Sequence, residues 1–108
     1  GAHRQTAWIP VIQELVRLEI KRAREQYPTP LSLHGGIGLL FAKLSRFVTF
    51  SAGHAVFTDE PSARVCRILL IQIAAVAIRL CEDVLGTTTV EDYNAYNENS
   101  DRVKGIKP

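Results

Sequence analysis

The residues best suited to acid–base or nucleophilic chemistry are few, three histidines and two cysteines in a chain of 108 residues. His34 precedes two glycines and His54 follows Gly53, and neither completes a Ser-His-Asp or Cys-His set. Cys66 and Cys81 lie on one predicted helix, about 22 Å apart, which is beyond the reach of a disulfide. We therefore predict capping or surface roles for the histidines, no catalytic residues, and two free, buried cysteines in a reduced, cytoplasmic protein.

A glycine-rich run, Gly35-Gly36-Ile37-Gly38, allows a phosphate-loop interpretation. It lacks the Gly-Lys-Ser/Thr ending and follows no predicted strand, so we interpret these glycines as residues that let two helices approach closely or that shape the entry of a helix. Carboxylates are absent from residues 26–58 and again from residues 61–81. Because Mg²⁺ requires carboxylate oxygens, these segments predict no metal site, and we expect no cofactor.

Hydrophobic periodicity predicts an all-α fold with three main helices. The first covers residues 6–27, carries Pro10 in its first turn and stops at the Pro28-Thr29-Pro30 run. The second begins between residues 32 and 36 and ends near residue 50, and the third begins at residue 59 or 60 and ends at Gly86. We predict one helical domain over residues 4–86, after a Gly-Ala-His start typical of a cloning scar. The polar residues 87–108 form a partly mobile extension, with a short helix near residues 90–97.

Composition limits the partners. The chain has 13 Lys and Arg against 11 Asp and Glu, a net charge of +2 that predicts no nucleic-acid or membrane-surface partner. The longest apolar run, Ile68–Ile78, is about half the length that a membrane-spanning helix needs.

The same run is apolar on nearly every face of the third predicted helix, and three helices of one small chain can hardly enclose it. We therefore predict a homodimer that completes the bundle.

Several segments resemble the MazG-like all-α nucleoside triphosphate pyrophosphohydrolases, in order and with similar spacing over residues 12–85. These segments are residues 20–28, His34-x-Gly36, Leu39-Leu40, and residues 71–79 followed by Glu82-Asp83. The most specific part is Gln72-x-Ala74-Ala75. The resemblance implies a helical bundle, usually dimeric or tetrameric, that uses Mg²⁺ to split a nucleotide into its monophosphate and pyrophosphate. The family's metal ligands are acidic residues on two successive helices.

Carried over position by position, the acidic positions of the family fall on residues that cannot ligate Mg²⁺ as carboxylates: Gly35, Ala42, Lys43, Ser45, Arg46, Leu69 and Gln72. Two interpretations follow. In the first, Leu69, Ala42 and Phe41 fill the cleft as core, while Lys43 and Arg46 extend to solvent. In the second, Lys43 and Arg46, with Gln72, bind a phosphate of a nucleotide or another small anion where the family places its metal.

The resemblance and these departures together predict a MazG-like homodimer that has lost Mg²⁺-dependent catalysis and acts as a binding or regulatory module. One alternative is an active nucleoside triphosphate pyrophosphohydrolase that draws acids from elsewhere, for instance Glu14, Glu19, Glu82 or Asp83. The other alternative is a purely structural protein–protein interaction domain.

Overall fold

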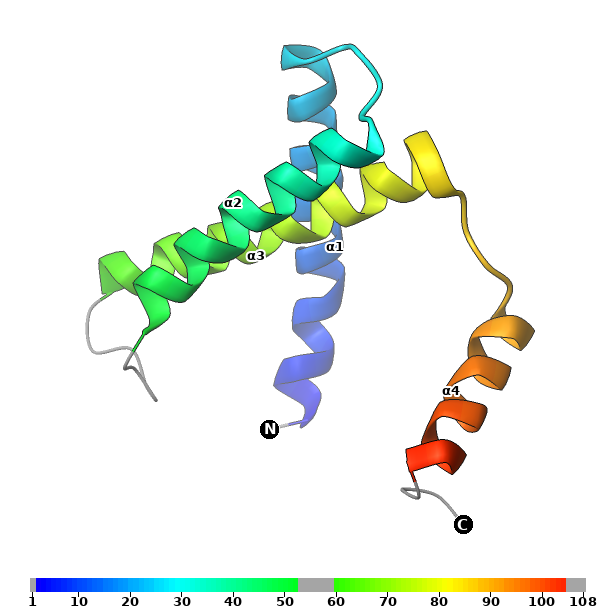
Figure 1. The fold of residues 1–108 in the computed structure, drawn as a ribbon. Helices are drawn as coiled ribbons and strands as arrows, with labels where there is room; N and C mark the ends of the chain where they lie inside the picture. The colour runs from blue at the N-terminus through cyan, green and yellow to red at the C-terminus, as the bar shows by residue number, and fades with distance from the viewer. Residues whose placement is uncertain (1, 53–59, 105–108) are drawn as a thin grey trace.

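A computed structural model describes the backbone of residues 2–52 and 60–104, and the side chains of residues 7–52 and 61–100. All regular structure in these ranges is helical, which confirms the predicted all-α class (Figure 1). The elements are α1 (Ala2–Gln26), α2 (Leu33–Ser51), α3 (Glu60–Leu80), the π-helical turn η1 (Cys81–Leu85) and α4 (Val90–Lys104). His54 lies outside the described residues.

The boundaries of α2 and of α3 with η1 follow from local capping. Ser32 has an extended backbone, and its hydroxyl accepts a hydrogen bond from the Gly35 N–H at 3.0 Å, which starts α2. At the other boundary Gly86 takes a φ of 71°, and its N–H donates to the Cys81 carbonyl at 2.6 Å. Glycine adopts this left-handed conformation without the steric cost that a side chain adds. Both boundaries agree with the sequence prediction.

Two helices are longer than predicted. α1 begins at Ala2, so Pro10 lies inside the helix rather than in its first turn. α4 continues to Lys104, beyond the predicted end near residue 97. The signals for α4 are local, because the Thr89 hydroxyl accepts from the Asp92 N–H at 3.1 Å and Glu91 and Asp92 occupy the first turn. The apolar stripe of α4 is weak, so the sequence predicted only the first half of this capped helix.

The helices α2 and α3 run antiparallel, side by side, and α1 crosses them (Figure 1). α4 projects away from the other helices (Figure 1), and its side chains up to residue 100 are exposed or half-buried. No helix of the described chain is long and apolar enough to cross a membrane.

One stripe of α3 supplies most of the core. Its buried residues follow one another at helical spacing: Ala63, Cys66, Leu69, Ala75, Val76, Arg79 and Leu80. α1 adds Val16 and Ala23. No large side chain in the described part of the chain is fully enclosed, and many large apolar side chains are exposed. The single chain therefore leaves much of its apolar surface in contact with water.

Burial corrects some predictions about individual residues. Leu69 and Cys66 are buried as predicted. Cys81 is exposed, because it belongs to η1, where the helical repeat changes and the core stripe ends. Phe41 is 69% exposed and Ala42 is exposed as well, so neither fills a cleft as core.

Gly36 is a point where α2 and α3 approach closely, which is one of the two roles that the sequence left open for its glycines. It is buried, and a Cβ added there would overlap the Leu80 side chain. A Cβ added to Gly38, two residues later, would meet nothing within 4 Å. The contact between α2 and α3 therefore requires a glycine at position 36 but not at position 38.

We expect Gly36→Ala to lower the free energy of unfolding by about 1–3 kcal/mol, because the added methyl group overpacks the contact with Leu80. Gly38→Ala is the matched control and should be neutral or stabilising by about 0.5–1 kcal/mol, since alanine favours a helix interior. Urea denaturation followed by circular dichroism measures both. Equal stability of the two variants would contradict the close approach of α2 and α3.

Candidate anion-binding site

A cavity of about 580 Å³ lies between α1, the linker after α1, α2 and α3. Its α3 side is formed by Gln72, Ala75, Val76 and Arg79, which share one face at positions i, i+3, i+4 and i+7. Tyr27 and Pro30 line it from the linker. The volume is within the range of about 300–1,000 Å³ that small-molecule sites occupy.

The charges around this cavity are mainly positive. Arg22, Lys43 and Arg79 line it, whereas Glu19 is the single carboxylate among the described lining residues. Arg22 pairs with Glu19 at 2.5 Å, which neutralises both charges. Lys43 and Arg79 remain as the cations whose charge no lining carboxylate balances. A cavity with this balance favours an anionic ligand.

Lys43 and Gln72 meet across this cavity. The Lys43 ammonium donates a hydrogen bond to the Gln72 side-chain oxygen at 3.0 Å. Since lysine only donates, the amide oxygen must face it, and the two N–H donors of the amide are left for another group. The ammonium likewise keeps two further N–H donors. The pair therefore presents four N–H donors against one remaining lone pair on the amide oxygen, and this excess of donors suits the oxygens of an anion.

The structure places Arg46, the third residue of the predicted site, differently. Arg46 is exposed on α2, one turn beyond Lys43, and it does not line the cavity. Of the three predicted residues, two are thus in contact and one stands apart. Arg79, which no sequence pattern indicated, lines the cavity instead. The spacing of seven residues from Gln72 could have indicated Arg79, because it places both side chains on the same face of α3.

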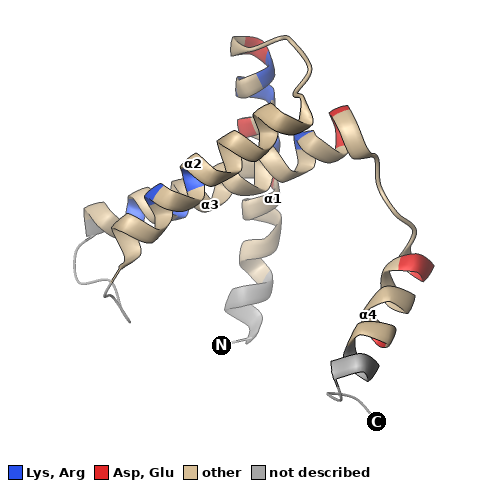
Figure 2. Ribbon diagram, viewed as in Figure 1, with Lys and Arg blue, Asp and Glu red and all other residues tan. Residues whose placement is uncertain are grey.

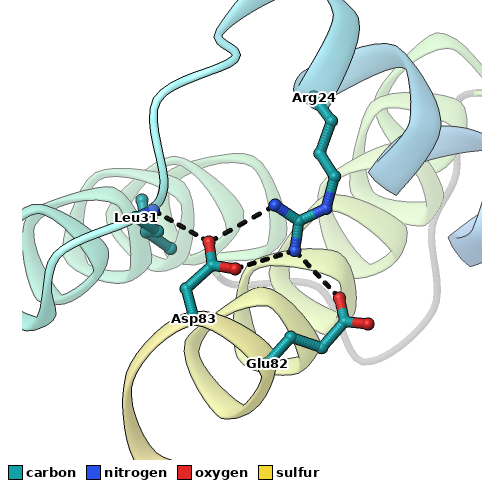
Figure 3. Close-up of polar contacts among 4 residues, drawn as sticks. All are labelled: Arg24, Leu31, Glu82 and Asp83. Atoms are coloured by element: carbon teal, nitrogen blue, oxygen red, sulfur yellow. Dashed lines mark hydrogen bonds and ion pairs between the residues drawn. The ribbon is translucent and has the colours of Figure 1, made fainter.

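A cluster of ion pairs holds the end of this site together (Figure 3). Arg24 of α1 donates to Glu82 at 3.0 Å and to both oxygens of Asp83 at 3.0 and 3.4 Å. Asp83 also accepts from the backbone N–H of Leu31 at 2.8 Å. One carboxylate thereby joins α1, the linker and η1. This contact fixes the linker that forms one wall of the cavity.

The same contacts lower the pKa of Asp83. The hydrogen bonds from the Arg24 guanidinium, followed by that from the Leu31 N–H, favour the ionised carboxylate and hold its pKa below the ordinary value. A lowered folded-state pKa stabilises the fold above the pKa of the unfolded group, about 3.9, and the stabilisation is lost as the pH falls through the folded-state pKa.

We expect the melting temperature of the wild type to fall below about pH 4 more steeply than that of Asp83→Asn. Glu14→Gln is the control, because the Glu14–Arg17 pair is also ionic but both side chains are more than half exposed. Water screens that pair, so its removal should leave the pH profile nearly unchanged. Thermal melts at decreasing pH measure the three profiles. Identical profiles for the wild type and Asp83→Asn would contradict the linkage.

The described acidic residues do not form a metal centre. No group of three or more His, Cys, Asp or Glu residues that could hold a metal ion occurs in the described part of the chain. Along the described side chains of α2 and α3, Figure 2 shows basic positions but no acidic ones. The four acids of the alternative catalytic hypothesis each pair with an arginine: Glu14 with Arg17, Glu19 with Arg22, and Glu82 and Asp83 with Arg24. These carboxylates are thus engaged in ion pairs at three separate places and do not converge on one site.

Comparisons of the chain with protein-family models, with curated proteins and with solved structures find no match. The resemblance to the MazG-like enzymes therefore remains a prediction from the residues quoted above. The site has to be interpreted from its own geometry.

Proposed function

We propose that this protein is a non-catalytic binding module of the MazG-like type, which takes a small anion, such as a phosphate group of a nucleotide, between α1, α2 and α3 without a metal ion. The observation that carries the proposal is the Lys43–Gln72 hydrogen bond at the wall of the cavity. It joins the one cation of α2 that lines the cavity to the amide of α3, both predicted as ligand-binding residues.

The chemistry of this pair supports an anion rather than a cation or a neutral ligand. N–H donors predominate in the pair, and hydrogen bonds from a charged donor to an anionic oxygen are about twice as strong as neutral ones. A divalent cation would meet the ammonium of Lys43 instead of a carboxylate, and like charges about 4 Å apart repel by on the order of 4 kcal/mol near a protein surface. The site therefore suits an anion that arrives without Mg²⁺.

Two assays test this function together. Calorimetric titration with pyrophosphate in the presence of a chelator should give saturable binding that weakens as salt is added, because charge pairs are screened. Incubation of nucleoside triphosphates with Mg²⁺ should release no pyrophosphate above background. Magnesium-dependent turnover by the wild-type protein would contradict the proposal and favour the alternative of an active hydrolase. Absence of any binding with chelator present would also overturn it.

A second feature supports self-association of the module, as the homodimer prediction requires. The chain exposes 8451 Å², whereas a folded monomer of 12.0 kDa exposes about 6,000 Å². The difference is about 2,400 Å², and the projecting helix α4 contributes to it. A standard interface removes about 800 Å² from each partner, which is less than this difference.

The surface that fits a second copy is an apolar groove between α1 and α3, which we call the α1–α3 groove. It encloses about 610 Å³ and is lined almost wholly by large apolar side chains: Trp8, Val11, Ile12 and Leu15 from α1, and Leu70, Ile71 and Ala74 from α3, with Arg67 at one side. Leu70 is 50% exposed there. We propose that the same groove of a second copy covers it, which would enclose the apolar middle of α3.

A further inference from the structure

Arg79 is a buried cation with an unsatisfied donor. The residue is only 5% exposed, and its Nε has no hydrogen-bond partner and is out of reach of water. Asp83 is the carboxylate that could pair with Arg79, but its oxygens already accept hydrogen bonds from Arg24 and from the Leu31 N–H. Asp83 therefore does not satisfy the Arg79 guanidinium through a hydrogen bond.

A donor of this kind is costly to the free protein. Buried polar groups in folded proteins are nearly always paired, and an unpaired one destabilises the fold, more so when it belongs to a charged group. A hydrophobic side chain of similar length could fill the same space without that cost. Because Arg79 also lines the cavity, an anion bound there could draw its guanidinium inward and accept the hydrogen bonds that it lacks.

The position of Arg79 relative to Gln72 sets the length of such a ligand. Seven residues of α-helix separate them, which is two turns or about 10.5 Å along the axis of α3. Between them on the same face lie Ala75 and Val76, both buried and without polar side-chain atoms. The α3 side of the cavity is thus polar at its two ends and apolar in the middle.

We propose that Arg79 is a second anion-binding residue of this cavity, and that the ligand carries two anionic groups separated by an apolar segment of about 10 Å, one held by Lys43 and Gln72 and the other by Arg79. The inference rests on the proposed function, because it requires the first anion site. It adds the shape and charge pattern of the ligand.

Two simple probes distinguish one anchor from two. Hexyl phosphate carries a single phosphate, whereas hexanediol bisphosphate carries one at each end of the same apolar chain. Calorimetric titration of the wild type should give at least about tenfold tighter binding of the bisphosphate, since the second contact forms within an already bound ligand. Ethanediol bisphosphate is too short to reach both ends, and its gain over ethyl phosphate should stay within about threefold.

Arg79→Gln should reduce the tenfold ratio to about twofold or less, while hexyl phosphate still binds through Lys43. Arg64→Gln is the matched control: it removes the same charge from an exposed position of α3 outside this cavity, so the ratio should persist. Equal affinities of the two probes for the wild type, or a ratio that survives Arg79→Gln, would overturn the second anchor alone. Failure of every phosphate to bind the wild type would overturn the proposed function with it.

Thermal stability without ligand separates a binding role from a structural one. If Arg79 serves a ligand, Arg79→Leu should leave the melting temperature unchanged or raise it, because the unpaired donor is gone. A structural role predicts the opposite, a fall of more than about 5 °C. Such a fall would contradict the inference even if ligand binding were lost as well.

Discussion

Leu70→Glu is expected to dissociate the proposed dimer into monomers of 12.0 kDa. Leu70 is half exposed in the single chain, so a carboxylate there meets water and leaves the monomer fold intact. In a dimer built on the α1–α3 groove the same carboxylate would be buried without a partner, at a cost of about 3 kcal/mol or more. Each of the two copies contributes one such carboxylate, so the two costs together weaken association by about 10⁴-fold, and light scattering over a concentration series measures it.

Phe41→Glu is the matched control for this prediction. Phe41 is an exposed apolar residue on α2, outside the α1–α3 groove, and should tolerate the same change without dissociation. Dissociation by Phe41→Glu but not by Leu70→Glu would place the interface on α2 and contradict the groove. A wild-type protein that stays at 12.0 kDa at high concentration would contradict self-association itself.

Lys43→Glu is expected to weaken pyrophosphate binding by about 100-fold or more, or about 2.7 kcal/mol. The change replaces the ammonium at the wall of the cavity by a carboxylate, so attraction of the anion becomes repulsion in a partly buried site. Calorimetric titration in the presence of a chelator measures the loss.

Arg46→Glu makes the same change of charge one turn away, on an exposed side chain outside the cavity. Solvent and salt screen that position, so its effect should stay within about threefold. If Arg46→Glu costs as much as Lys43→Glu, the anion binds on the exposed face of α2 and the cavity is not the site.

Much of the fold could be predicted because its signals are local. Ser32 and Gly86 set helix ends through contacts within a few residues, and proline stops α1 in the same way. Gly36 could be interpreted as a close approach because a helix interior rarely keeps glycine without a packing reason. The exposed faces of α2 could not be predicted, since Phe41 has the residue type and spacing of a core position.

The candidate site could be predicted only in part. Lys43 and Gln72 were found through a family pattern, and the hydrogen bond between them joins residues 29 positions apart. Arg79 was missed because at the end of an apolar run a cation is ordinarily solvated, and burial of its side chain depends on α1 and the linker. Arg24 and Asp83 are 59 positions apart in the sequence, so the spacing of residues within one helix could not predict their contact.

The most direct test of the central claim, metal-free binding of an anion at the Lys43–Gln72 pair, is to follow the side-chain amide signals of Gln72 by NMR during titration with pyrophosphate and chelator. We predict that these signals shift and saturate, and that more pyrophosphate is needed at higher salt, because the contact is ionic. Gln72 signals that stay in place while pyrophosphate binds, or that move only once Mg²⁺ is added, would contradict it.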